Sequence, residues 1–391
     1  MTGKAAHALL GASNAERWGA CPISVTAPGG SATNEAAAEG TLGHDIADKV
    51  LRGQPYPAVG SQHKVEGFTF TITEDFLRDV QAYVDYVQSR PWVGGYNAES
   101  QVNYSYLLEV PFGVAWGTTD CKGFTKDLIT GEVVLEVIDL KMGRKGVDPD
   151  WNPQGMMYAA GVIDEHRTIA PLPGNMKVRI TIFQPRHSYT AKSWLTMVSQ
   201  VEEFVFSQRH AAQAAVAFVA GTQTPLQVLQ FPETPGGHCH YCPRKVSCKA
   251  HTALAKRAAT ATEIRWDPEL FNMRSSIESF FKELESIAYE QAMTGAPFPG
   301  TKLVQNSRGG NPTFLRTEAE VKARAAELNV AVTQTTLLTP AKVRDAFYKA
   351  NMPAEEVASF VSKPTKGFKI VSTSEAGEAV VSDIGKDFVG V

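Results

Sequence analysis

The chain has 391 residues, a formal net charge of −3 at pH 7 and a hydrophobic fraction of 43%, which is ordinary for a globular protein. No apolar run approaches the roughly 20 residues of a membrane helix, and the first ten residues lack the basic-then-apolar layout of a secretory signal. These features predict a cytoplasmic protein with no membrane association. The charge does not decide for or against nucleic acid, because phosphate contacts are made by a local patch.

The first half of the chain has the pattern helix, three strands, helix, strand, which is typical of an α/β protein. A short helix is expected to begin near Ser13 and to end close to Cys21. Apolar residues at helical spacing predict two longer helices, at Ala36–Leu51 and Glu74–Gln88. Runs rich in β-branched and aromatic residues predict consecutive strands, at Val102–Pro111, Trp116–Phe124 and Glu132–Leu140.

A helix from Pro153 to about His166 and a fourth strand at Met176–Gln184 complete this pattern. Two long helices are then expected, at Ser193–Ala220 and Asp267–Thr294. We therefore predict a core in residues 1–255, with a cysteine cluster closing its ends. Residues 256–297 would form a connecting long helix, and residues 298–391 a small α+β module with helices near 318–328 and 340–349 and a flexible tail.

Two carboxylates and a lysine follow apolar strands. Asp120 lies in the second predicted strand, and Asp139 and Lys141 lie near the end of the third. Residues i and i+2 of a strand point to one face, so Asp139 and Lys141 project together and an adjacent strand can bring Asp120 beside them. Carboxylate oxygens are ligands for Mg²⁺ or Mn²⁺, and an ammonium can assist the attacking water. An isolated Asp-x-Lys is more often a surface salt bridge.

Further polar residues flank this motif. Gln154 and Tyr158 are one turn apart on one face of the next predicted helix. His44 lies in the first long helix and can add a nitrogen ligand. Arg144 and Lys145 follow the strand in a Gly-containing turn and, with Arg17, are candidates for phosphate contacts. Solvated surface residues would be an equally simple interpretation.

Cysteines form the second motif. Cys239, Cys242 and Cys248 crowd into a short segment, and such thiols in a reducing compartment usually bind metal. A fourth ligand must come from elsewhere, and Cys21, before the core, is the candidate. Zinc is the alternative, because His251 can complete a Cys3His site, and His238 and His240 offer other nitrogens. Cys121, beside Asp120, is expected to be a buried core thiol.

In this order, the carboxylate and lysine series resembles the RecB-like nuclease family of the PD-(D/E)xK superfamily. The resemblance covers about residues 9–251 and implies a restriction-endonuclease-like core, a mixed sheet flanked by helices. It implies that His44, Asp120, Asp139 and the Ile138 carbonyl bind metal and that Lys141 assists the water. It also implies that Gln154 and Tyr158 position DNA and the catalytic groups.

The split cysteine arrangement resembles the [4Fe–4S] staple of AddB-type and CRISPR-adaptation nucleases, which ties the two ends of a domain together. The implied activity is a Mg²⁺- or Mn²⁺-dependent exonuclease acting on single- or double-stranded DNA. A non-catalytic DNA-binding or recombination-partner protein and a structure-specific endonuclease are the alternatives.

Three stretches resemble a phage-encoded branch of that family, classed as a domain of unknown function. They are Ala8–Pro22, Ala36–His44 and Leu337–Pro340. This resemblance suggests a role in phage DNA recombination, replication or degradation. It also suggests a phage recombinase or single-strand-binding partner, and a ring-shaped homo-oligomer. No residue pattern defines cleavage polarity or strand preference.

Overall fold

The structure is a computed structural model that describes residues 8–27, 34–167, 169–260, 266–295 and 298–301. The described residues up to Glu285 belong to one compact unit, and those from Ser286 onwards to a second. The expected helices near 318–328 and 340–349 and the stretch Leu337–Pro340 lie outside the described residues. None of the helices in the described part of the chain is both long enough and apolar enough to cross a membrane.

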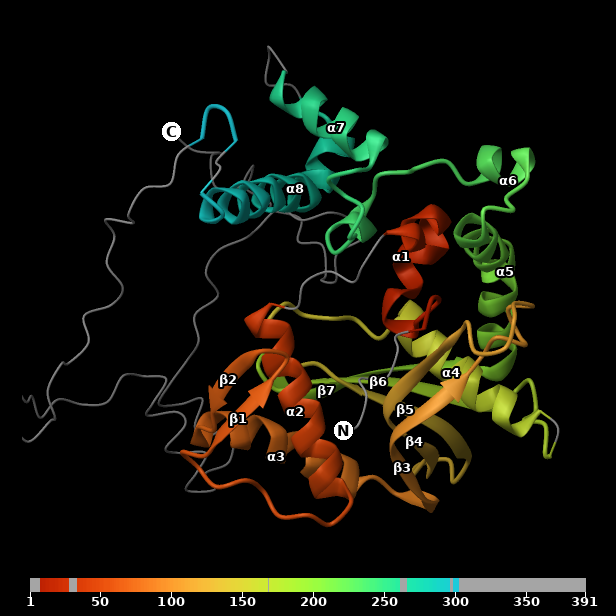
Figure 1. The fold of residues 1–391 in the computed structure, drawn as a ribbon. Coiled ribbons are helices and arrows are strands. Elements are labelled where there is room, and N and C mark those ends of the chain that lie inside the picture. Colours follow the sequence, from red (N-terminus) through yellow and green to blue (C-terminus); the bar gives the residue numbers. More distant parts are fainter. Residues whose placement is uncertain (1–7, 28–33, 168, 261–265, 296–297, 302–391) are drawn as a thin grey trace, which may run out of the picture. The chain divides into compact units, whose positions relative to one another are not determined.

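A five-stranded mixed sheet in the order β3-β4-β5-β6-β7 forms the centre of the first unit (Figure 1). The neighbours β3–β4, β4–β5 and β6–β7 are antiparallel, and β5–β6 is parallel. The crossover between the parallel strands contains α4, Pro153–His166. The strands are β3 (Trp92–Asn103), β4 (Trp116–Lys126), β5 (Val133–Leu140), β6 (Lys177–Gln184) and β7 (Ser188–Met197).

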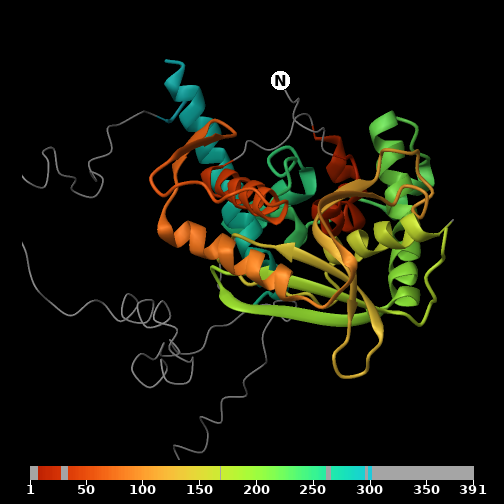
Figure 2. The same ribbon diagram turned by 90° about the horizontal axis from the view of Figure 1, so that it is seen from below.

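Helices cover both faces of this sheet (Figures 1 and 2). On one face α1 (Ala15–Ala20), α4 and α5 (Val198–Ala220) pack on a core that includes Leu135 and Val137 of β5. On the other, α2 (Glu35–Leu51) and α3 (Glu74–Ser89) pack on Ile138 and Leu140. Because successive strand residues point to opposite faces, β5 contributes to both cores and is almost entirely buried.

Local sequence explains where these helices begin. Asn34 and Thr73 accept hydrogen bonds from the first-turn amides of α2 and α3. Asn152 does the same for α4, and Pro153 occupies its first position, where a missing amide hydrogen is no loss.

The predicted mixed α/β architecture, a sheet flanked by helices, is confirmed, but some element boundaries were wrong. The strand expected at Val102–Pro111 lies earlier, at Trp92–Asn103, and the stretch after Tyr104 forms a turn. Tyr104 and Leu108 are buried there, whereas Tyr106 is exposed, and Tyr104 donates from its hydroxyl to the Leu10 carbonyl (2.8 Å). Residues 193–197, expected in a helix, belong to β7, and α5 begins only at Val198.

The remaining elements follow or flank the core. A hairpin of β1 (Gln62–Val65) and β2 (Phe68–Thr71), which periodicity did not predict, precedes α3. In place of one helix, residues 256–297 contain the end of α7 (Lys249–Ala259) and α8 (Pro268–Met293). The short helices are η1 (Ala12–Asn14), η2 (Pro22–Thr26), α6 (Pro225–Gln230) and η3 (Gly237–Cys239).

Candidate functional site

The two predicted aspartates face each other across neighbouring strands. Cys121 pairs with Ile138 in the β4–β5 ladder, and continuing this register places Asp120 opposite Asp139. From the Leu140 amide, a 2.6 Å hydrogen bond reaches Asp120 Oδ2. The other oxygen of Asp120 lies 3.0 Å from Nδ1 of His44 in α2. The structure thus brings together side chains from α2, β4 and β5.

Asp139 is the centre of a second set of contacts. The Lys141 ammonium lies 2.9 Å from Asp139 Oδ2, and the Gln154 amide nitrogen donates to Oδ1 (3.0 Å). Gln154 also accepts from Lys141 (2.8 Å) and donates to the Tyr158 hydroxyl (3.0 Å). The predicted pairing of Asp139 with Lys141 on a strand face, and of Gln154 with Tyr158 on a helix face, is therefore confirmed as geometry.

Burial shifts the pKa values of Asp139 and Lys141. Asp139 is 3% exposed, and burial raises the pKa of its carboxyl, against the pull of Lys141 and with a further push from Asp120. Burial opposes the charged form of Lys141, but Asp139 outweighs it and raises the pKa of the ammonium. Lys141 therefore stays protonated near neutral pH and holds a positive charge beside Asp139.

Among the carboxylate oxygens of this site, Asp139 Oδ2 is buried and accepts no aligned hydrogen bond, and its contact is the ion pair with Lys141 at 2.9 Å. A buried carboxylate oxygen of this kind is expensive unless something else completes its surroundings. Asp120 Oδ1 and His44 Nδ1 are oxygen and nitrogen donors of the kinds that a divalent cation takes in proteins. The donor types of His44, Asp120 and Asp139 fit a divalent cation, but no ligand atoms of all three residues lie within 4.8 Å of one another.

Glu99 of β3 joins the site, and the sequence did not indicate it. Its Oε1 lies 3.8 Å from His44 Nδ1, and single ligand atoms of His44, Glu99 and Asp120 all lie within 4.8 Å of one another. Burial and the neighbouring Asp120 raise the pKa of Glu99 to about 7. Burial opposes protonation of His44, but Asp120 and Glu99 outweigh it and raise the pKa of His44 to about 9.

The remaining residues predicted to bind metal or DNA lie in three different places. Ile138 lies beside Asp139 in the central strand, with its side chain in the α2–α3 core, and the role of its carbonyl as a ligand stays a prediction. Arg144 and Lys145 are exposed in the turn after β5, and their contact with phosphate stays a prediction. Arg17 lies in α1 and donates from Nη1 to the Ser24 carbonyl (3.3 Å), next to the cysteine segment.

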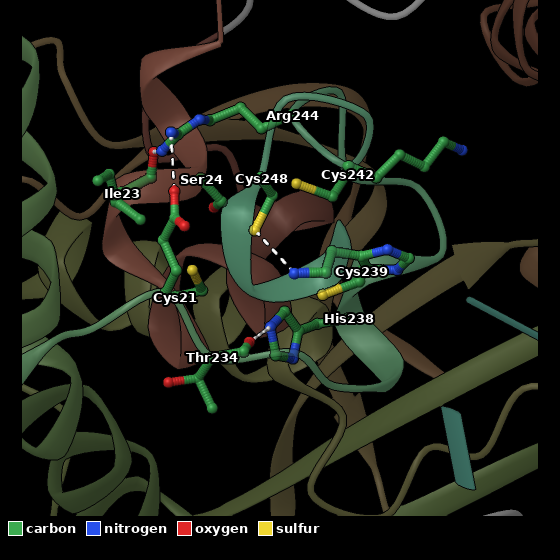
Figure 3. Close-up of a pocket in the computed structure, with 12 residues that line it drawn as sticks. Cys21, Ile23, Ser24, Thr234, His238, Cys239, Cys242, Arg244 and Cys248 are labelled. Carbon is green, nitrogen blue, oxygen red and sulfur yellow. Dashed lines mark hydrogen bonds and ion pairs between the residues drawn. The ribbon is translucent and has the colours of Figure 1, made fainter. Parts of the chain in front are cut away.

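The four predicted cysteine ligands line one pocket (Figure 3). Cys21 follows α1 and comes from the N-terminal end of the chain, whereas Cys239, Cys242 and Cys248 come from the segment after α6. Their sulfur atoms turn towards a common space, and none is in a disulfide. The expected meeting of Cys21 with the distant cluster is therefore present in the structure.

Backbone and charged groups complete the pocket. Cys239 accepts a hydrogen bond from the Gly236 amide (3.3 Å), and Cys248 accepts one from the His251 amide (3.4 Å). Arg244 donates to the Ile23 carbonyl (2.9 Å), which ties the cysteine segment to the N-terminal segment. Burial raises the pKa of the Cys239 thiol to about 12, so a bound metal would be needed to hold it as a thiolate.

The histidines proposed as alternative ligands differ in position. His251 and His238 line the pocket, and His240 does not. His251 is fully buried, its Nε2 lies 2.7 Å from the Ser276 hydroxyl, and its Nδ1 has no partner among the described residues. Cys121, as predicted, is a buried core thiol.

Spacing distinguishes this pocket from the carboxylate site. We compared the distances between histidine nitrogens, cysteine sulfurs and carboxylate oxygens. Among the described residues, His44, Glu99 and Asp120 are the one set of three residues in which these atoms lie within 4.8 Å of one another. No three of the pocket's cysteines and histidines are therefore that close. In a tetrahedral zinc site the sulfurs are about 3.8 Å apart.

Residues 7–378 match the sequence profile of a family described as protein of unknown function (DUF2800). The chain belongs to this family. The predicted placement in a family of unknown function is thus confirmed, and the finer resemblance to RecB-like nucleases stays a prediction.

Among solved structures, one titled "Crystal structure of SSO0001" is similar at 12% identity over 45% of this chain and 70% of that chain. Its TM-score is 0.22, and a similarity of that size does not establish a shared fold.

Proposed function

We propose that this DUF2800 protein is a metal-dependent DNA nuclease of the RecB-like type, acting as an exonuclease on DNA ends in phage DNA recombination, replication or degradation. The observation that carries the proposal is the arrangement at the end of β5. There, Asp120 and Asp139 lie opposite each other, with Lys141 and Gln154 in contact with Asp139 and His44 in contact with Asp120. We further propose that the sheet with α2, α3 and α4 is a restriction-endonuclease-like core.

Each side chain has a role in hydrolysis. A divalent Mg²⁺ or Mn²⁺ ion, bound by Asp120, Asp139 and His44, would supply Lewis-acid stabilisation of the phosphate and a water of lowered pKa. Lys141 holds a fixed positive charge beside Asp139, where it orients the attacking water and offsets charge growing on the phosphate. Gln154 fixes Asp139 and Lys141 by a hydrogen bond to each, and Tyr158 supports Gln154.

We propose that the cysteine pocket holds a [4Fe–4S] cluster, which would tie the two ends of the nuclease core together. The separation of the sulfurs supports a ligand wider than a single zinc ion. The pocket's own hydrogen bonds to Cys239 and Cys248 stabilise sulfur in its anionic form. Zinc held by Cys239, Cys242, Cys248 and His251 is the alternative, since His251 has an unpartnered Nδ1 in the same pocket.

The deciding experiment is digestion of end-labelled DNA by the full-length protein with Mg²⁺ or Mn²⁺. We expect linear DNA to be degraded and circular DNA to be spared, because the proposed activity requires an end. The variant Asp139→Asn should lose activity by at least about 10³-fold, since several kcal/mol of transition-state stabilisation depend on the metal.

The matched control is Glu132→Gln, which removes an exposed carboxylate directly before β5. It should digest DNA at the wild-type rate. Full activity of Asp139→Asn would disprove the proposed site, and degradation of circular DNA would replace the exonuclease with an endonuclease. A wild-type protein that binds DNA without cutting it would support a non-catalytic DNA-binding role.

A further inference from the structure

Two tryptophans stack on the surface beside the N-terminus of α4. The ring centroids of Trp151 and Trp194 are 5.0 Å apart, and the angle between the ring planes is 48°. Trp194 lies in β7 and is half-buried against the core that α4 and α5 cover, whereas Trp151 is 53% exposed. A large part of one indole ring is therefore open to solvent, with a second ring supporting it.

The backbone at Trp151 does not favour a tryptophan. Its φ of 51° is in the left-handed region, where bulky residues are rare. Asn152 fixes the chain on one side, because its side chain donates to the Asp148 carbonyl (3.1 Å) and accepts from the Gly155 amide (3.0 Å). Asparagine or glycine would adopt the same φ with less strain. Strain of this kind gathers at sites where a side chain has a function.

The pair lies close to the carboxylate site. In the sheet, one residue of β6 pairs with both Asp139 of β5 and Lys192 of β7, so the three form a row across the strands. Because neighbouring strands are about 4.8 Å apart, the α-carbon of Lys192 lies roughly 10 Å from that of Asp139. Trp194 is two residues from Lys192 and shares its face of the sheet. Trp151 is three residues before Gln154, which donates to Asp139.

Exposed cations flank the pair. Lys192 is exposed on β7, and Arg144 and Lys145 are exposed in the loop between β5 and α4. Gln184 fixes the backbone of this loop, because its side chain donates to the Lys145 carbonyl (2.7 Å) and accepts from the Val147 amide (3.1 Å). Cations on a fixed backbone beside the carboxylate site suit the phosphates of a nucleic acid.

Acidic residues are the nearest charged groups to Trp151 in the chain. Asp148 and Asp150 come three residues and one residue before it. Their negative charges disfavour a phosphate at the indole itself. An uncharged nucleobase meets no such repulsion and can stack on an aromatic ring. The surroundings therefore favour phosphates at Lys192 and the loop cations, and a base at Trp151.

We propose that Trp151, supported by Trp194, is a stacking position for an unpaired nucleobase of a DNA strand that passes the carboxylate site. This inference rests on the proposed nuclease function and adds to it a residue that selects unpaired over paired DNA. Bases inside a duplex are stacked on their neighbours, whereas an unpaired base can turn one face to the indole. Every base has such a face, so the position selects strandedness and not sequence.

The test is the affinity of the full-length protein for labelled oligonucleotides with nuclease-resistant phosphorothioate links, measured by fluorescence anisotropy with Mg²⁺ present. Trp151→Asn should bind a single strand about 5- to 150-fold more weakly than the wild type, as expected for the loss of one stacked base. Its affinity for a blunt duplex should be unchanged. Trp151→Phe should keep most of the single-strand affinity, because it keeps an aromatic face.

An abasic strand of the same length distinguishes base stacking from other effects. It keeps the phosphates and lacks the bases, so the wild type should bind it more weakly than the normal strand. This preference should fall in Trp151→Asn by the factor that separates the two proteins on the normal strand. A tryptophan that only supports the loop would weaken binding to both strands equally.

Thermal unfolding and a matched variant complete the comparison. Trp151→Asn should melt at or near the wild-type temperature, because asparagine tolerates the left-handed φ that strains tryptophan. The control is Trp266→Asn. Trp266 is 73% exposed and contacts Phe271 in a similar way, with ring centroids 5.0 Å apart and an angle of 46°. This variant should bind each oligonucleotide as the wild type does.

The outcomes separate the two proposals. Equal affinity of the wild type for normal and abasic strands would overturn the stacking position, whatever the variants do. A wild-type dimer that Trp151→Asn dissociates in sedimentation would also overturn it and assign the pair to contact between copies of the chain. Digestion of DNA by the wild type would leave the nuclease proposal standing in both cases. A wild type that neither binds nor digests DNA would overturn the nuclease proposal, and this inference with it.

Discussion

The carboxylate site and the cysteine pocket are built in opposite ways. His44, Asp120, Asp139 and Lys141 are carried by a long helix and the central strands or their ends, and hydrogen bonds between side chains already hold them in place. The cysteines lie at helix ends and in turns from two distant parts of the chain, joined by few hydrogen bonds such as that from Arg244 to Ile23. The first site is organised by the fold, whereas the second would organise the fold by binding the proposed cluster. Removing a side chain should therefore lower the cleavage rate at the carboxylate site and the melting temperature at the cysteine pocket.

The largest effect is expected at Lys141. The variant Lys141→Met should lower the cleavage rate by about 10²–10⁴-fold, because it removes the charge that offsets the developing phosphate charge. Mn²⁺ binding should survive, since Lys141 is not a ligand. DNA digestion and Mn²⁺ titration measure the two effects. Lys177→Met, which removes a half-exposed lysine at the start of β6, is the control and should be fully active. Loss of Mn²⁺ together with activity would contradict this division of roles.

At the cysteine pocket the expected effect is on stability. Cys21→Ala should lose the cluster and lower the melting temperature by at least about 5 °C, because metal binding here is also folding free energy. Iron analysis of anaerobically purified protein, with about four irons per wild-type chain, measures the first effect. Calorimetry measures the second.

Cys121→Ala is the matched control, because its thiol lies in the α2–α3 core and not in the pocket. It should keep its iron. A Cys21→Ala protein that retains one zinc ion would instead assign the site to Cys239, Cys242, Cys248 and His251.

A smaller effect is expected from pH on the metal-free protein. The pKa of Glu99 is raised from 4.5 to about 7, which means that the folded state favours the protonated carboxyl. The stability gained from this protonation is fully present below pH 4.5 and is lost as the pH rises to about 7. The pKa of His44 is raised from 6.5 to about 9, so its contribution is lost between those values. Relative to wild type, Glu99→Gln should therefore gain stability as the pH rises from about 4.5 to about 7.

Melting temperatures measured across this range, with and without Mn²⁺, test that expectation. Bound Mn²⁺ should reduce the pH dependence of the wild type, because the ion replaces the protons. A constant difference between Glu99→Gln and wild type at every pH would show that Glu99 does not titrate in this window.

The smallest effect concerns DNA binding. Replacing Arg144 and Lys145 by Ala should weaken affinity and reduce the slope of log K against log salt by about one per residue. Cleavage at saturating DNA should be unchanged. Fluorescence anisotropy over a range of salt concentrations measures the slope, and Lys49→Ala on α2 is the control. An unchanged slope would show that this turn does not contact phosphate.

Local patterns were sufficient to predict several parts of the site. Asp139 and Lys141 are two residues apart in a strand, and Gln154 and Tyr158 are one helical turn apart, so their shared faces follow from backbone periodicity. The spacing of Cys239, Cys242 and Cys248 likewise places three thiols in one short segment. Each of these groupings involves residues that are close in the chain, so it can be predicted from the sequence.

Glu99 could not be predicted in this way. It belongs to the site because β3 pairs with β4 in one register and because its backbone is left-handed, and neither property has a local signal. The boundary of β3 was missed for a related reason, since Tyr104 and Leu108 are buried after the strand has ended, Leu108 in a turn.

The sequence by itself determined the chemical inventory: the carboxylates, the lysine, the cysteine spacing and the helix and strand that carry most of them. The meeting of His44 with Asp120 and of Cys21 with the later cysteines was expected only from the resemblance, and tertiary structure alone decided that Glu99 joins His44 and Asp120. The physical reason is that strand register and the packing of chain ends are settled by long-range contacts, which leave no periodic pattern in the residues that meet. The carboxylate site therefore has a third acid that only the pairing of β3 with β4 reveals.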